Sequence, residues 1–137
     1  MTITKTITIN ADPAAVFRLY EAVSDWPKWD TEVEAVHLPK GLVRGATGWL
    51  KPRQGPKSAI FVDEVKHGRC FTVKSRLPLC EMNFGHDIAE HNGKSMVTHW
   101  VTFVGPLSPL FRYLIGRPIA KTLPATLAGL KAECEKA

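Results

Sequence analysis

Two histidines have the residue type and spacing best suited to chemistry in this chain. His86 and His99 lie in two alternating segments, 79–91 and 94–105, that flank Asn92-Gly93. Asn-Gly between alternating segments is the strongest short signal for a two-residue β-hairpin turn. With that turn, the pairing register places His86 directly opposite His99 on one side of the sheet.

The neighbours of the two histidines on this side of the hairpin are apolar. The same register gives three further cross-strand pairs: Met82 with Phe103, Phe84 with Val101, and Ile88 with Val97. The opposite side carries Glu81, Asn83, Asp87 and Thr102, together with Met96 and Trp100. The sequence therefore predicts an inward-facing apolar stripe with a histidine pair at its middle. A register slip of one residue would turn both histidines outward.

This histidine pair has two interpretations, and the residues alone leave both open. In the functional one, the rings orient a ligand hydroxyl or carbonyl, or transfer protons as catalytic groups. Burial and a second imidazole both disfavour protonation, so neutral rings are expected at pH 7. In the structural one, each ring hydrogen-bonds to the other, to a backbone group or to a trapped water. A metal needs further ligands, which Cys80 and Glu81 could supply only in another register, so we expect no metal and no cofactor.

The segments before the hairpin supply the rest of a sheet and two short helices. Alternation over Thr4–Ile9 predicts a first strand, and Asp12-Pro13 predicts the N-cap and first residue of a helix. Ser24-Asp25 can cap a second short helix that Pro27 opens. Four more strands are expected at 32–38, 46–51, 58–66 and 69–77.

Residues 107–136, near the end of the chain, are helical by period. Leu123, Leu127, Leu130 and Cys134 share one face, and Leu107, Leu110, Phe111 and Leu114 form an earlier apolar face. Gly116, Pro118 and Pro124 interrupt the pattern, which leaves a continuous and a broken helix open. We expect one element with a bend near 115–118.

The opening of the chain resembles that of the START-like (SRPBCC) superfamily, which includes the birch pollen allergen and polyketide cyclase/dehydrase-like proteins. The resemblance rests on the strand Ile7-Thr8-Ile9, the helix start at Asp12-Pro13 and the elbow Trp26-Pro27-Lys28-Trp29. It implies an α+β helix-grip fold over residues 1–137 as a single domain. In that fold a curved seven-stranded antiparallel sheet wraps around a long C-terminal helix, with two short helices after the first strand.

The resemblance also implies a cavity between the sheet and the C-terminal helix, where concave apolar sites commonly bind ligands. The expected ligand-binding residues are Met82, Phe84, His86, Ile88, Val97, His99, Val101, Phe103, Phe111, Leu114, Ile115 and Trp49. The leading hypothesis is binding of a hydrophobic small molecule, such as a lipid, a polyketide or an aromatic metabolite. One alternative is a polyketide cyclase/dehydrase-type enzyme in which His86 or His99 transfers protons. A second is a protein-interaction module with a filled core and an exposed apolar patch.

Composition excludes several other classes of function. The net charge of +5 comes from scattered basic residues without an aromatic-basic motif, so no nucleic-acid binding is expected. No segment approaches the roughly 20 apolar residues that cross a bilayer, and there is no phosphate-binding glycine loop or hydrolase motif. Three widely spaced cysteines, Cys70, Cys80 and Cys134, fit a reducing cytoplasm. The sequence leaves the oligomeric state open.

Overall fold

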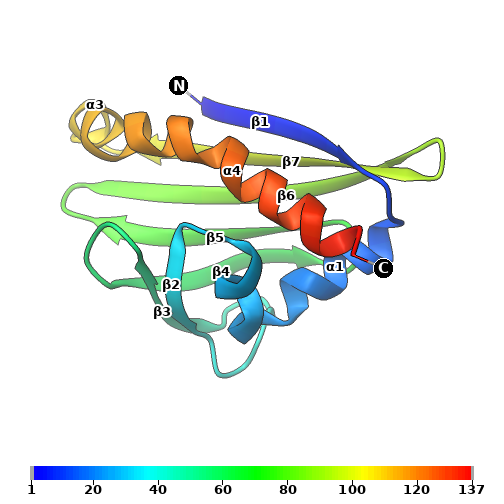
Figure 1. Cartoon of the computed structure of the whole chain (residues 1–137). Helices are drawn as coiled ribbons and strands as arrows, with labels where there is room; N and C mark the ends of the chain where they lie inside the picture. Colours follow the sequence, from blue (N-terminus) through cyan, green and yellow to red (C-terminus); the bar gives the residue numbers. More distant parts are fainter. Residues whose placement is uncertain (1, 137) are drawn as a thin grey trace.

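The computed structural model describes residues 2–136 and contains one antiparallel sheet in the order β1-β7-β6-β5-β4-β3-β2. Its strands are β1 (Thr2–Ile9), β2 (Val33–His37), β3 (Thr47–Pro52), β4 (Ser58–Lys66), β5 (Cys70–Leu77), β6 (Cys80–His91) and β7 (Lys94–Val104). Figure 1 shows this sheet curving around the long C-terminal helix, which crosses it diagonally. The expected seven-stranded helix-grip fold is confirmed.

Two short helices follow β1, as expected. The first, α1 (Pro13–Glu21), has Asp12 at its N-cap, where the carboxylate accepts a 2.8 Å hydrogen bond from the Ala15 N–H. A 3₁₀ turn (Val23–Asp25) then leads into α2 (Trp26–Trp29). Asp25 occupies the N-cap position of α2 but forms no capping bond with its side chain, contrary to the expectation. Its carboxylate instead lies 3.2 Å from Lys28 Nζ, so proline geometry starts this helix without a side-chain cap.

The central hairpin has the register expected from Asn92-Gly93. His86 pairs with His99, and the apolar pairs on either side of them are as expected. Asn92 and Gly93 both have positive φ, of 53° and 78°, which a tight turn of this kind requires. This turn therefore determines which side chains of β6 and β7 face the helices.

The C-terminal helix is continuous from Ser108 to Cys134. It consists of α3 (Ser108–Phe111), a π-helical turn (Arg112–Gly116) and α4 (Arg117–Cys134). The irregularity expected near 115–118 is thus a turn with hydrogen bonds five residues apart, not a break. The Arg117 N–H bonds to the Arg112 carbonyl, so proline at 118 removes no bond that this turn needs.

The two halves of this helix pack on different parts of the molecule. Its last turns contact α2 so closely that a Cβ atom at Gly129 would overlap the Trp29 carbonyl oxygen. At the end of α4, Lys131 donates a 3.0 Å hydrogen bond to the Thr8 carbonyl of β1. The buried apolar residues fall into two clusters, one around α1, α2 and the end of α4, the other around the start of the helix. Phe84 packs against both clusters.

Candidate functional site

His86 and His99 lie on the covered side of the sheet and contact each other. Their ring centroids are 4.6 Å apart, with an edge-to-face arrangement. The His86 ring also stacks on Phe71 at 3.9 Å, and its Nδ1 donates a 3.3 Å hydrogen bond to the Phe71 carbonyl oxygen. Because a carbonyl only accepts, Nδ1 carries the proton and the other ring nitrogen, Nε2, has a free lone pair. Within the described residues, no hydrogen bond is formed by this Nε2.

Tyr20 is the third member of this polar cluster, and the sequence did not single it out. Its hydroxyl and Nε2 of His99 form a 2.6 Å hydrogen bond, and its ring packs edge-on against His86 at 5.5 Å. Tyr20 belongs to the apolar stripe of α1 and is almost completely buried. The available signal was the hydroxyl itself, since a buried tyrosine O–H usually finds a partner.

Burial determines the charge of this cluster. The pKa of His86 is lowered from 6.5 to about 4, mainly because the interior disfavours the charged ring. The pKa of His99 is lowered for the same reason and by the neighbouring His86. Burial raises the pKa of the Tyr20 hydroxyl. All three side chains are therefore neutral at pH 7.

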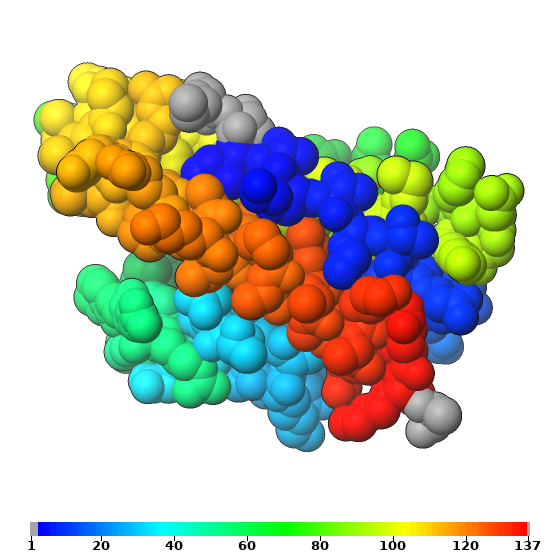
Figure 2. Space-filling view, turned by 45° about the horizontal axis from the view of Figure 1, so that its top comes forward, coloured from blue at the N-terminus to red at the C-terminus, as the bar shows by residue number. Residues whose placement is uncertain are grey.

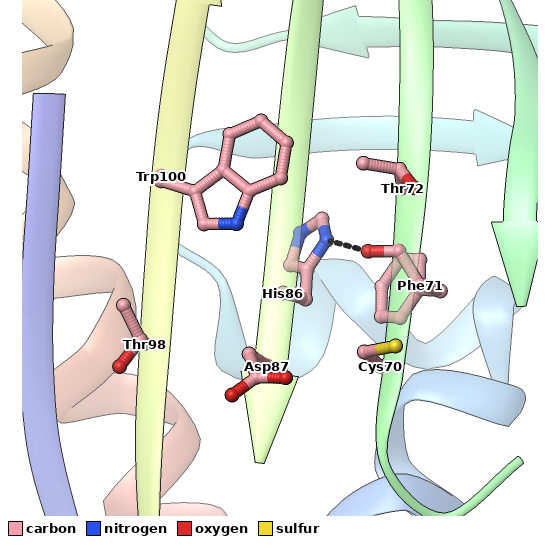
Figure 3. Close-up of a pocket in the computed structure, with 7 residues that line it drawn as sticks. All are labelled: Cys70, Phe71, Thr72, His86, Asp87, Thr98 and Trp100. Atoms are coloured by element: carbon pink, nitrogen blue, oxygen red, sulfur yellow. Dashed lines mark hydrogen bonds between the residues drawn. The ribbon is translucent and has the colours of Figure 1, made fainter. Parts of the chain in front are cut away.

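His86 is half-buried, and together with Phe71 it also lines a hollow on the other side of the sheet. Figure 3 shows this hollow, of about 340 Å³, with the side chains of Trp100, Asp87 and Thr98 on the outer side. The Trp100 indole lies on Gly85, where a Cβ would overlap it. Aromatic rings are known to pack on glycines of a sheet in this way, so we interpret the hollow as part of the packing of the sheet and not as a ligand site.

Trp29 places an unpaired polar atom beside the same cluster. Its ring lies 6.0 Å from that of Tyr20, and the residue is 6% exposed. Among the described residues its indole N–H has no hydrogen-bond acceptor. The next residue, Asp30, is satisfied, because its carboxylate accepts hydrogen bonds from the Thr126 hydroxyl and the Glu32 N–H, each 3.0 Å long. Burial raises the pKa of Asp30.

The structure brings most of the residues expected at the ligand site to one face. Met82, Phe84, Ile88, Val97, Val101 and Phe103 lie with the two histidines on the covered side of β6 and β7. Phe111 and Ile115 of the C-terminal helix pack against the cluster around Met82 and Phe103. These residues therefore form one apolar surface between sheet and helix.

Leu114 and Trp49 do not join this surface. Leu114 is 54% exposed, because the π turn places more residues in each turn and shifts the inward face from Leu114 to Ile115. Trp49 pairs with His37 and Ala59, one position away from the buried Ile60, and therefore lies on the outer face. There Lys57 Nζ lies 4.5 Å from the Trp49 ring centroid.

In residues 2–136, no group of three or more His, Cys, Asp or Glu side chains is arranged to hold a metal ion. The described helices also include none that is long and apolar enough to cross a membrane.

Comparison with protein families assigns the chain. Residues 1–135 match the family model described as "Polyketide cyclase / dehydrase and lipid transport". The chain belongs to this family. Membership agrees with the START-like resemblance of its opening residues and places the chain in a superfamily of hydrophobic ligand-binding folds. A comparison with curated protein sequences gave no match.

Solved structures share the fold of this family member over nearly its whole length. The aromatase/cyclase Zhui from Streptomyces sp. R1128 has 13% identity and a TM-score of 0.76, with 98% of this chain and 93% of that chain covered. The protein TTHA0849 from Thermus thermophilus has 15% identity and a TM-score of 0.75, with 98% and 97% covered. Ara h 8.0201 has 13% identity and a TM-score of 0.72, again with 98% and 97% covered. At these identities the likeness shows the fold alone.

Proposed function

We propose that the protein binds a hydrophobic small molecule between the sheet and the C-terminal helix, and that the molecule carries a hydroxyl or enol group. The observation that carries the proposal is the indole N–H of Trp29, buried in an apolar interior without an acceptor among the described residues. Buried donors are nearly always paired, so a donor left over in a core points to a group supplied from outside the chain. The family description, which includes lipid transport, supports the same class of ligand.

The polar atoms around Tyr20 support a hydroxyl as the ligand's polar group. Trp29 Nε1 donates a hydrogen bond, and His86 Nε2 accepts one. A ligand hydroxyl would be complementary to both, because its oxygen can accept a hydrogen bond from Trp29 while its hydrogen is donated to His86. Tyr20 and His99 are hydrogen-bonded to each other, and both rings contact the ring of His86. In this proposal they hold His86 in position.

The apolar part of the ligand would contact the side chains between the two core clusters. Phe84 is half-buried at the junction of these clusters, although it lies on the covered side of the sheet. Figure 2 shows the surface hollowed between the first half of α4, in orange, and the strands coloured cyan and green. We place the ligand's entrance there.

A cyclase/dehydrase-type enzyme is the second candidate, and the tautomer of His86 favours it. A neutral imidazole with a free Nε2 lone pair can accept a proton from a carbon or hydroxyl beside a ligand carbonyl, and its pKa of about 4 makes it a weaker base than an exposed histidine. The carbonyl oxygen would then accept the hydrogen bond from Trp29 as negative charge develops on it. Free thiols at Cys70, Cys80 and Cys134 support action in a reducing compartment such as the cytoplasm.

The test compares two probes that differ by one hydroxyl, 1-naphthol and naphthalene, in equilibrium binding to the purified protein. The wild type should bind 1-naphthol more tightly, by about tenfold, since one satisfied buried hydrogen bond is worth about 1 kcal/mol or more. His86→Phe should reduce this preference, because only the hydrogen bond from Trp29 then remains, while naphthalene binding is retained.

A matched pair of variants on one strand locates the site. Phe84→Trp narrows the junction of the clusters and should weaken both probes, whereas Asn83→Ala, with its side chain on the outer face, should weaken neither. Equal effects of the two substitutions, or a hydroxyl preference of the same size in His86→Phe as in the wild type, would overturn the proposed site.

A further inference from the structure

Five large apolar side chains are exposed at one end of the molecule. This apolar end consists of Leu79, Val104, Leu110, Tyr113 and Leu114, exposed by 67%, 58%, 46%, 62% and 54%. The turn between β5 and β6 is bound to the start of the C-terminal helix, because the Leu107 N–H donates a 3.1 Å hydrogen bond to the Leu79 carbonyl. Figure 1 shows this turn, the end of β7 and α3 together at the left of the view. An apolar group of this size on a surface commonly marks an interaction site.

The chain surrounding this apolar end is positively charged. Between Glu90 and Glu133 the sequence contains no acidic residue. Arg112, Arg117 and Lys121 follow one another along the helix and form no salt bridge with any described residue. These three cations therefore remain available to an anionic partner.

Contacts at the apolar end keep positive charge close to its exposed apolar side chains. The Arg117 guanidinium lies 5.2 Å from the centroid of the Tyr113 ring. Glu81, at the start of β6, is paired with Lys74, whose Nζ lies 3.2 Å from the Glu81 carboxylate and 3.8 Å from that of Asp63. An apolar surface flanked by basic residues is complementary to an anionic lipid bilayer. Basic side chains bind the headgroups, and apolar side chains enter the boundary between headgroups and acyl chains.

We propose that this end of the molecule docks on the surface of an anionic lipid bilayer. Leu110, Tyr113 and Leu114 enter the headgroup region, and Arg112 and Arg117 contact the anionic headgroups. The π turn contributes Leu114 to this surface, because it rotates that side chain out of the core. The docking surface involves neither the histidine pair nor Trp29, so it stands independently of the ligand proposed above.

Flotation with vesicles tests the docking surface. The full chain is mixed with vesicles of phosphatidylcholine alone or of phosphatidylcholine with phosphatidylglycerol, at low and high salt. Binding is expected to the anionic vesicles and should weaken with salt. Leu110→Ser combined with Leu114→Ser should lower the partition coefficient about tenfold or more, since two half-exposed leucines lose their burial. Arg117→Glu should lower it by about tenfold, since it reverses one basic charge at the surface.

Matched controls use exposed residues elsewhere on the molecule. Val43→Ser removes an equally exposed apolar side chain, and Lys28→Glu reverses an exposed charge; neither should alter flotation. Absence of binding to anionic vesicles, or losses of the same size in these controls, would overturn the proposal. So would a dimer in sedimentation that the double leucine variant dissociates while vesicles are not bound, because the apolar end would then join two copies of the chain.

The naphthol assay in vesicle-free buffer separates the two proposals. The leucine and arginine variants should bind 1-naphthol as the wild type does. Loss of vesicle binding with retained naphthol binding would therefore concern the docking surface alone, and failure of naphthol binding with retained flotation would concern the ligand site alone.

Discussion

The two buried imidazoles should make the free energy of unfolding fall as the pH is lowered from 8 to 5. The pKa of His86 in the folded protein is about 4, against an ordinary value of 6.5. Between these values the unfolded chain binds a proton that the folded protein does not, so acid favours unfolding. The loss begins below about pH 6.5 and is complete near pH 4.

The size of the effect follows from the two pKa values of His86. At pH 5 the proton bound by the unfolded chain lowers the free energy of unfolding by about 2 kcal/mol relative to pH 8. His99 adds a contribution of the same sign, because its pKa is also lowered. Asp30 acts in the opposite direction: burial raises its pKa above 3.8, so as the pH falls the folded protein binds this proton before the unfolded chain does. The difference between the wild type and a variant without the His86 imidazole therefore isolates the contribution of that histidine.

The assay is urea denaturation at pH 5, 6, 7 and 8 in one buffer mixture of constant ionic strength. His86→Phe keeps a ring against Phe71 but cannot bind a proton, so its stability should change with pH by about 2 kcal/mol less than that of the wild type. His91→Asn, at the exposed end of β6, should retain the wild-type dependence. A wild-type stability that is constant over this range, or an unchanged dependence in His86→Phe, would refute the burial argument.

Three substitutions test the packing around the site. Gly129→Ala should destabilise the protein by about 1–3 kcal/mol, because the added methyl overlaps the Trp29 carbonyl, although alanine normally favours a helix; a stabilised variant in thermal melts would contradict the close approach. Tyr20→Phe should cost about 1–3 kcal/mol in urea denaturation, since His99 loses its hydrogen-bond partner in the interior, and a neutral result would show that the bond contributes nothing. Leu114→Ser should change stability by less than about 0.5 kcal/mol, since the side chain is exposed; a larger loss would place it back in the core.

The sequence predicted those parts of the molecule that depend on local rules. Asn92-Gly93 determines the turn of the central hairpin, and the two-residue alternation of strands then brings His86 opposite His99. The capped start of α1 follows from Asp12 and its neighbouring proline in the same way. The register of the β6–β7 hairpin and the N-cap of α1 could therefore be predicted from the sequence alone.

The hydrogen-bond partners of the histidines could not be predicted from the sequence, because they depend on contacts between segments that are distant along the chain. In the sequence, Tyr20 is one more apolar residue of a helical stripe, and only the packing of α1 on β6 and β7 brings its hydroxyl to His99. The exposure of Leu114 depends on a π turn, which regular helical periodicity does not predict. The placement of Trp49 on the outer face depends on its pairing with β4, which no turn motif in the sequence specified.

Native mass spectrometry of the protein purified from its own host tests whether a ligand occupies the space between the sheet and the C-terminal helix. We expect an additional mass that disappears on denaturation and corresponds to an apolar molecule with at least one hydroxyl or enol oxygen. Phe84→Trp, purified in parallel, should carry much less of it. An adduct without such an oxygen, equal occupancy in the two proteins, or a bare wild-type chain that also fails to bind 1-naphthol would contradict a ligand site between the sheet and the C-terminal helix.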